Sequence, residues 1–430
     1  MSDPANLVVR PVPRWVRVWA VVTLVLAVVL ITIGGFVTSF RVGMADPVWP
    51  TEPWYLVGKD WGKLEFGFLV EHTHRLAGWL TGAATLVLAV GAFAYEPDRR
   101  LRLFGLAAIL LLVGAYGEFH RGMREVWKQV QERAGSEYHL DPKRADFEGQ
   151  LAGRHLLDRT GGWPVPAGAA AAVLAVALLA AGGLAAAGGR PGGAARAAAA
   201  SALVCVMIQG LLGGFRVFLN ALAGTDLAAV HGVFAQVTFC VFAAVAILAA
   251  PRRAGDALPD ADRRGFGRLA WALVGLVFVQ LLWAVMVRHQ GSGVAQRLHI
   301  LTAFAVTGLT VWIAARILTT PAAKGRLAGQ AYHLIGILAI QVMLGVEAYM
   351  GKFAAVGPQA QVPPMLREVR PAQAGVRTAH QLIGTGLLAA GVGLALRAGR
   401  RPLAAGVVRP AAGESPAPGP LRSPAAAAVP

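Results

Sequence analysis

Apolar residues along the chain form long, nearly uninterrupted blocks that are separated by short polar segments. The eight clearest blocks have these approximate bounds: 15–40, 68–95, 197–219, 226–250, 268–287, 297–318, 330–350 and 376–397. A helix needs about 20 apolar residues to cross a bilayer, and each block is at least that long. The pattern therefore predicts an all-α integral membrane protein with at least eight spans.

An inserted segment, 101–190, separates the second block from the third. It contains two further apolar blocks, 101–119 and 165–188, on either side of a polar stretch, 120–164. We expect an inserted pair of helices joined by a polar outer loop, and an even number of extra crossings leaves the orientation of the other helices unchanged. The tail, 401–430, is rich in Pro and Ala and is expected to be disordered.

The positions of the basic residues predict the orientation in the membrane. Arg10, Arg14 and Arg17 precede the first block, which places the N-terminus in the cytoplasm under the positive-inside rule. Later basic clusters fall on the same side of the predicted membrane, at 99–102, 252–264, 324–326 and 397–401. We therefore expect a multi-pass protein of the cell (inner) membrane with both termini in the cytoplasm.

The composition agrees with a membrane protein and excludes some kinds of functional site. Only 15% of the residues are charged and 56% are hydrophobic, whereas about 25% are charged in an average soluble domain. The net charge of +17 is explained by topology, so no nucleic-acid partner is expected. Cys205 and Cys240 both lie inside apolar blocks, which excludes a CxxC motif and a thiolate metal site.

Each even-numbered block carries one histidine near its predicted outer end, and these residues are His74, His231, His299 and His380. Ionisable residues inside a membrane are costly and suggest a function. Each histidine is followed four residues later by a small residue on the same helix face, namely Gly78, Ala235, Ala303 and Gly384. Imidazole is a standard axial ligand of haem iron, so four histidines suggest two haems. The alternative is ordinary small-residue packing with interhelical hydrogen bonds.

A repeat relates the two ends of the chain. Three odd-numbered blocks carry a glutamine followed three residues later by a large apolar residue: Gln209 with Leu212, Gln280 with Trp283, and Gln341 with Leu344. The run Gly34-Gly35-Phe36 also matches Gly213-Gly214-Phe215. We therefore expect two related four-helix halves, the first from 1–100 and 191–250 and the second from 251–400, each with one histidine pair.

Charged residues near His74 suggest that a reaction takes place beside this histidine. Glu71 lies one turn before His74, where a carboxylate could handle protons or balance positive charge, or could simply be solvated at the interface. His72 points away from this face and is expected at the interface. Three arginines at outer helix ends could pair with haem propionates or reach lipid phosphates: Arg216, Arg288 and Arg297. The insert histidines, which lack metal-ligand spacing, are expected to be exposed: His120, His139 and His155.

Taken together, these motifs resemble the heme A synthase family. The matching elements are Glu71-x-x-His74-Arg75, the Gln-Gly-Leu-Leu-Gly-Gly-x-Arg-Val run at 209–217, His231-Gly-x-x-Ala-Gln, Met286-Val-Arg-His-x-Gly-Ser-Gly, Arg297-Leu-His299 and Thr378-Ala-His380. The resemblance covers all eight main blocks and omits the insert and the tail. Two features depart from the family pattern: the insert itself, and the absence of a cysteine pair from 41–63.

The resemblance implies a specific reaction and a role for each residue. The family oxidises the C8 methyl group of haem O to a formyl group, giving haem A for cytochrome oxidase, and holds a haem b cofactor in its C-terminal half. By this resemblance, His299 and His380 would ligate haem b, His74 and His231 would ligate the substrate haem, and Glu71 would be the catalytic carboxylate. The implied partners are the lipid bilayer, haem O, a haem O synthase and an electron donor.

Two other classes of membrane protein compete with this interpretation. A di-haem membrane cytochrome that only transfers electrons would also use two pairs of histidines in four-helix bundles. A transporter is disfavoured because no apolar block is interrupted near the middle of the membrane, and because the ionisable residues lie toward the outer face.

Overall fold

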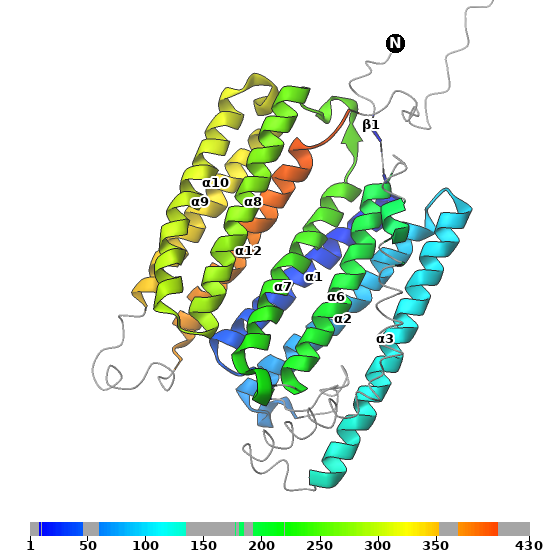
Figure 1. Ribbon diagram of the computed structural model, residues 1–430, viewed down its shortest axis with the longest axis vertical. Helices are drawn as coiled ribbons and strands as arrows, with labels where there is room; N and C mark the ends of the chain where they lie inside the picture. The colour runs from blue at the N-terminus through cyan, green and yellow to red at the C-terminus, as the bar shows by residue number, and fades with distance from the viewer. Residues whose placement is uncertain are drawn as a thin grey trace, which may run out of the picture.

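Nearly all of the regular structure is helical (Figure 1). The computed structural model describes residues 8–9, 11–45, 60–134, 177, 180–184, 192–218, 220–351 and 369–402. The long helices are α1 (Arg14–Ser39), α2 (Phe66–Ala94), α3 (Arg99–Ala134), α6 (Gly193–Phe218), α7 (Asn220–Ala249), α8 (Asp260–His289), α9 (Gly293–Thr319), α10 (Pro321–Met350) and α12 (Pro371–Ala398). The short elements are the 3-10 turns Trp61–Lys63 and Ala254–Asp256 and the strands β1 (Val8–Val9) and β2 (Arg252–Arg253), which pair antiparallel.

Nine helices in the described ranges are long and apolar enough to cross a membrane, which confirms the predicted multi-pass, all-α class. Each of the eight main apolar blocks corresponds to one of them. The ninth contains the first insert block, 101–119, and here the prediction needs a correction: α3 continues as helix to Ala134, where an outer loop was expected. The second insert block, 165–188, lies outside the described residues except for 177 and 180–184, and so does the tail from 403 onward.

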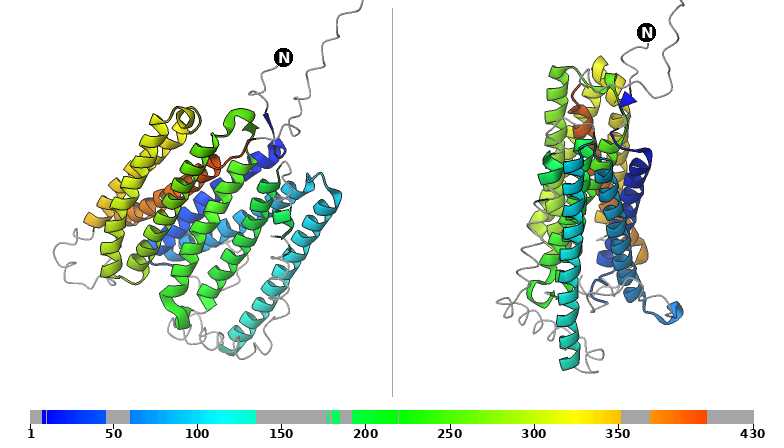
Figure 2. Two further views of the ribbon diagram at one scale, coloured as in Figure 1. Left: turned by 45° about the horizontal axis from the view of Figure 1, so that its top comes forward. Right: turned by 90° about the vertical axis from the view of Figure 1, so that its right-hand side faces the viewer.

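The axes of the helices are roughly aligned (Figures 1 and 2). Their contacts form two closed rings of four helices each. In the first group, contacts follow the cycle α1, α2, α6, α7 and back to α1. In the second group, they follow α8, α9, α10, α12 and back to α8. The groups meet through α1 with α12, α7 with α12 and α7 with α8, while α3 packs against α2 at the edge of the first group.

Burial in this molecule follows the pattern of a protein in lipid. Small residues such as Ala20, Ala199 and Ala270 are almost completely buried between helices, where they let the backbones approach closely. Large apolar residues face outward instead: Leu110 and Phe304 are each 73% exposed and Met343 is 71% exposed. Such surfaces would aggregate in water but are solvated by lipid tails.

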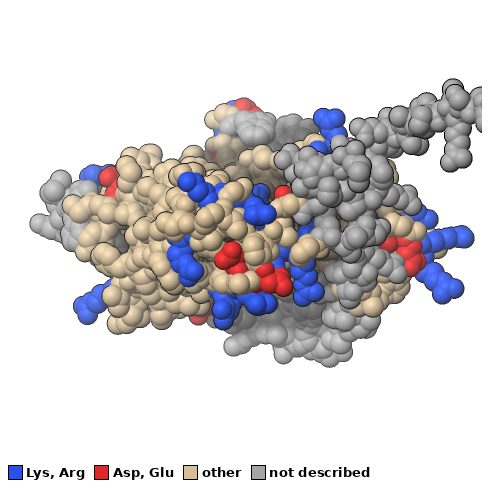
Figure 3. All heavy atoms as spheres, turned by 90° about the horizontal axis from the view of Figure 1, so that it is seen from above, with Lys and Arg blue, Asp and Glu red and all other residues tan. Residues whose placement is uncertain are grey.

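The basic connecting segments gather at one end of the molecule, where β1 pairs with β2. The contacts between them are Arg252 Nη2 to the main-chain oxygen of Arg401 at 2.7 Å, Arg326 Nε to that of Gly255 at 2.7 Å, and Arg400 Nη1 to Asp256 Oδ2 at 3.1 Å. Burial lowers the pKa of Arg252, and nearby Arg400 lowers it further. Figure 3 looks onto this end, where Lys and Arg side chains surround a few acidic ones. The clusters that the positive-inside rule grouped together are therefore together in space.

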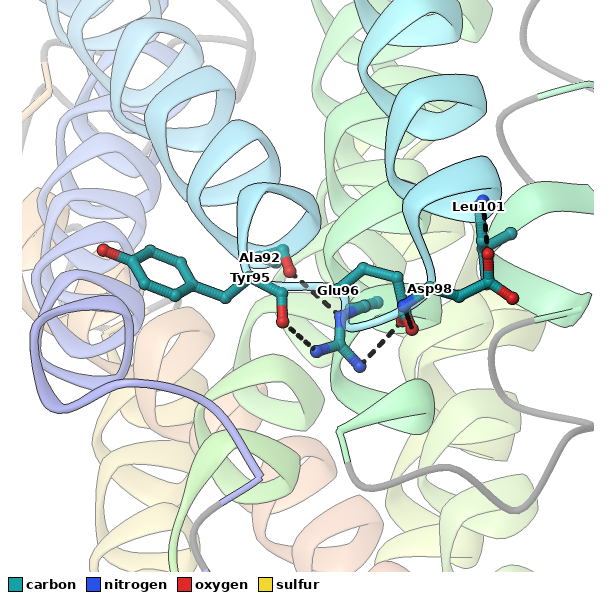
Figure 4. Close-up of polar contacts among 6 residues, drawn as sticks. Ala92, Tyr95, Glu96, Asp98 and Leu101 are labelled. Atoms are coloured by element: carbon teal, nitrogen blue, oxygen red, sulfur yellow. Dashed lines mark hydrogen bonds and ion pairs between the residues drawn. The ribbon is translucent and has the colours of Figure 1, made fainter.

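A buried ion pair holds the start of α6 against the end of α2 (Figure 4). Arg196 Nη1 lies 3.1 Å from Glu96 Oε2, and the two side chains are 2% and 0% exposed. The same guanidinium donates to the main-chain oxygens of Ala92 and Tyr95, both at 3.0 Å. Ala92 is in the last turn of α2 and Tyr95 is its C-cap residue, so both carbonyls lie where helical partners are missing and Arg196 caps that helix end.

Replacing Arg196 by alanine is expected to destabilise the protein by about 3–5 kcal/mol, because it leaves a buried carboxylate and two carbonyls without their cation. The measurement is the free energy of unfolding in detergent. Arg121→Ala is the control, since its ion pair with Glu118 is exposed and such pairs contribute little. Equal effects of the two substitutions would show that the buried pair is not a stabilising contact.

Candidate functional site

The four intramembrane histidines form two pairs. The ring of His74 on α2 faces that of His231 on α7, with centroids 6.5 Å apart and planes at 78°. The ring of His299 on α9 faces that of His380 on α12, with centroids 6.3 Å apart and planes at 76°. In each ring of four helices the two contributing helices are diagonally opposite, so each pair lies inside its own group.

Both pairs lie toward the same end of the molecule. Each histidine follows the first residue of its candidate span by six to nine residues, the spans being Phe66–Ala94, Thr225–Ala249, Gly293–Thr319 and Pro371–Ala398. At about 1.5 Å per residue, the rings lie about 9–14 Å along the helix from that first residue. These four helices finish at the basic end, so the histidines lie toward the opposite end.

Glycines on the neighbouring helices make space for three of the four rings. A Cβ added to Gly34 would lie 2.8 Å from Cε1 of His74, one on Gly345 would lie 3.0 Å from Cε1 of His380, and one on Gly213 would lie 3.3 Å from Cε1 of His231. These rings therefore rest directly against a helix backbone. This packing is the physical reason why the run Gly34-Gly35-Phe36 of α1 is repeated as Gly213-Gly214-Phe215 in α6.

The three repeated glutamines each contact the histidine of the next main helix. The contacts are Gln209 Nε2 with both ring nitrogens of His231 at 3.1 and 3.2 Å, Gln280 Nε2 with the main-chain oxygen of His299 at 2.8 Å, and Gln341 Nε2 with Nε2 of His380 at 3.4 Å. His299 also places Nδ1 3.2 Å from the main-chain oxygen of Gln280. A histidine that ligates a metal commonly donates its other ring N–H to such an oxygen, so this contact leaves Nε2 of His299 able to act as a ligand.

The spacing of both pairs leaves room for one metal ion between two imidazoles. The ring centroids are 6.5 and 6.3 Å apart, and bonds from a metal to an imidazole nitrogen are about 2.0 Å long. Nδ1 of His74 and of His380 is buried without a hydrogen-bond partner, which leaves binding capacity on these rings. Within the described part of the chain, no three metal-binding side chains come together.

The space expected beside the histidines is found in part. A Cβ added to Gly78 would meet only Leu30, at 4.0 Å, so the face next to His74 is open. A Cβ added to Gly384 would lie 3.0 Å from Nε2 of Gln341, so the amide of Gln341 occupies the corresponding place beside His380. A flat group at the second pair therefore requires this amide to move.

We found no match to this chain among protein-family models, curated proteins or solved structures. Support for any function of the chain therefore comes from its own residues, and above all from the geometry of the two histidine pairs.

Glu71 is part of a buried polar cluster beside His74, and the solvated interfacial alternative is wrong. Its side chain is 5% exposed, and Oε1 lies 3.0 Å from Nη2 of Arg75, which is itself mostly buried. Arg216 from α6 lies close enough to interact electrostatically with Glu71 and Arg75. A carboxylate and two guanidiniums are thus held near one histidine of the first pair.

Two histidine predictions also need correction. His72 is not interfacial: it is 1% exposed, and its ring stacks on that of Phe68 with centroids 5.5 Å apart. His120 on α3 is not exposed but partly buried, with its ring 4.7 Å from that of Tyr116 and 5.7 Å from that of Trp79. The positions of His139 and His155 lie outside the described residues.

The three outer arginines have different surroundings. Arg216 lies against the segment after α1, since a Cβ added to Gly43 would clash with its Nη2. Arg288 hydrogen-bonds to side-chain and main-chain groups of α1 and α12, contacts that the sequence did not suggest. Arg297 is exposed, as expected of a side chain that reaches lipid headgroups.

Proposed function

We propose that this chain is a haem-dependent oxidoreductase of the heme A synthase type, built from two related four-helix halves. The observation that carries the proposal is the separation of the histidine rings, which in both groups would allow two imidazoles to hold one haem iron. Ionisable side chains inside a membrane are costly and commonly mark a functional site. One haem between each pair accounts for all four histidines.

The two pairs are proposed to have different roles. His299 and His380 hold a resident haem b, while His74 and His231 hold haem O as substrate. The position of Glu71 supports this division, because it lies three residues before His74. The residues three positions before the other histidines are not acidic; they are Ala228, Gln296 and Arg377. A buried carboxylate therefore marks one member of the first pair alone.

Glu71 is proposed to assist the oxidation of the C8 methyl group of haem O to a formyl group, which removes four electrons from that carbon, adds one oxygen atom and therefore requires an oxidant supplied from outside the chain. Its carboxylate, held in place by Arg75, can balance positive charge that develops at the edge of the substrate. The contact with Gly34 holds the ring of His74, which lies one turn after Glu71 on the same helix face. When bound at the second pair, haem b supplies one-electron redox chemistry.

The proposed setting is the cell (inner) membrane, with the basic end and both termini in the cytoplasm. The gathered arginines at that end support this orientation. Both histidine pairs then lie toward the outer face. The proposed partners are the enzyme that makes haem O and a donor of electrons.

Identification of the haems bound to the purified protein tests this proposal. Expression together with a haem O synthase is expected to give haem b plus haem O or its oxidised derivatives. The near-identical geometry of the two pairs favours one alternative, a di-haem cytochrome that only transfers electrons. That alternative predicts a single kind of haem that is never modified, and finding it would replace the synthase proposal.

Replacing Gly34 by valine is expected to weaken haem binding at the first pair by at least about tenfold, because the new side chain displaces the ring of His74 and misplaced ligand orientation commonly costs that much. Haem b at the second pair should be unaffected. The measurement is the content of each haem in the purified variant. Gly275→Val on α8 is the control, since a Cβ there meets nothing within 4 Å. Equal losses in both variants would mean that Gly34 has no specific role.

A further inference from the structure

Arg288 bridges the two helix groups. It lies in the last turn of α8 and is partly buried. Its Nη2 donates to the main-chain oxygen of Gly35 at 3.1 Å and to Oγ of Ser39 at 2.8 Å, both on α1. Its Nη1 donates to Oε1 of Gln381 on α12. One guanidinium from the second group therefore joins the first helix of the chain to the last.

The residues that Arg288 contacts are next to the histidine sites. Gln381 directly follows His380 in α12. Gly35 directly follows Gly34, the residue whose backbone supports the ring of His74. The hydrogen bonds of Arg288 therefore connect one histidine of each pair. On one side they reach the residue after His380, and on the other side they reach the residue after Gly34, which contacts His74.

The helices joined by Arg288 are packed tightly at this level. A Cβ added to Gly35 would lie 2.7 Å from Cγ2 of Thr378, so α1 and α12 approach as closely as a glycine permits. Oγ of Ser39 and Oγ1 of Thr378 lie 3.1 Å apart and share a hydrogen bond, and both side chains are buried. The guanidinium of Arg288 thus hydrogen-bonds to both helices at a place where the two helix groups are closely packed.

The charge of Arg288 has no acidic partner in the part of the chain that the structure describes; its acceptors are an amide, a hydroxyl and a main-chain carbonyl. A fixed positive charge in a medium of low dielectric constant favours any nearby group in its more electron-rich form. At a haem, that form is the reduced one, so such a charge raises the reduction potential.

We propose that Arg288 is a positioning residue that couples the two histidine sites. It fixes the separation and orientation of the cofactor site relative to the substrate site, and its charge raises the reduction potential of the haem held by His299 and His380. The inference rests on the proposed function, since it concerns the haems assigned to the two pairs. It adds a connection between the sites that neither pair provides by itself.

Three variants distinguish the effect of the hydrogen bonds of Arg288 to two helices from the effect of its positive charge. Arg288→Gln removes the charge, and the midpoint potential of the resident haem should fall. Arg288→Lys keeps the charge but cannot reach acceptors on both helices with a planar fork, so the potential should change little. In both variants the conversion of haem O should fall about tenfold to a hundredfold, because small displacements of reacting groups have effects of that size. Arg268→Gln, an exposed arginine on the same helix 20 residues before Arg288, should change neither quantity because it lies toward the opposite end of α8.

The measurements are a redox titration of the resident haem and chromatography of the extracted haems, on preparations shown to be monodisperse. A full complement of haem with equal potentials in Arg288→Gln and Arg268→Gln, and unchanged conversion, would overturn the inference and leave the proposed function intact. Absence of haem from the unmutated protein would overturn both. A lowered potential in Arg288→Gln but not in Arg288→Lys, with reduced conversion in both, would support the coupling role.

Discussion

Replacing His299 or His380 by alanine is expected to remove the resident haem b from the purified protein. In the proposed site the imidazoles of His299 and His380, whose ring centroids are 6.3 Å apart, would both ligate the iron and would be its direct attachment to the chain. Loss of a residue that merely orients a ligand lowers metal affinity about 10–100-fold, so loss of the ligand itself should have at least that effect. The measurement is the ratio of haem b to protein, together with the visible spectrum.

Two other histidines provide controls for this result. His333→Ala should leave the haem ratio unchanged, because His333 lies on α10 of the same helix group but is exposed. His74→Ala should also keep haem b, because it belongs to the other pair. Full haem with an unaltered spectrum in His299→Ala or His380→Ala would reassign the ligand. Loss of haem b from His74→Ala would instead show that the division of roles between the pairs is wrong.

The helices could be predicted from the sequence because the bilayer imposes their length. Each of the eight main blocks became a helix, as expected when a chain must satisfy every backbone group within the apolar layer. The ends were predicted less well. Helix α8 begins at Asp260 where the apolar block begins near 268, and α10 begins at Pro321 where its block begins near 330. Hydropathy marks the membrane boundary, whereas a helix can continue through polar residues into water.

The pairing of the histidines could also be predicted from the sequence, because four residues at similar depth in a twofold repeat can meet only in a few ways. The contacts around them could not be predicted. Whether Glu71 binds Arg75, or whether Arg288 faces lipid or the neighbouring helix group, depends on how each helix is rotated about its axis. Arg196 was missed for the same reason, because it lies in a run of alanines and its partner Glu96 is 100 residues earlier in the chain. A basic residue within an otherwise apolar, small-residue run is the signal that could have identified it.

Replacing Glu71 by glutamine is expected to slow the conversion of haem O about a hundredfold while leaving both haems bound. The substitution keeps the shape of the side chain and removes only its charge. In the proposed reaction, a buried carboxylate one turn from His74 would stabilise positive charge that is greatest in the transition state, so the effect should appear in turnover more than in binding. Loss of one such preorganised group commonly lowers the rate about 100–1000-fold. The measurement is the amount of haem A and of unconverted haem O in cells that also express a haem O synthase.

Glu65→Gln is the matched control, because this carboxylate lies on the same segment, at the N-cap of α2, but is exposed. Conversion by this variant should equal that of the unmutated protein. Arg75→Gln should lower the rate less than Glu71→Gln does, since it removes one guanidinium near the carboxylate and leaves the carboxylate itself in place. If Arg75→Gln were the more severe change, the ion pair would serve to hold the guanidinium in place, and the catalytic role would pass to Arg75. Haem A at the level of the unmutated protein in Glu71→Gln would exclude Glu71 from the reaction altogether.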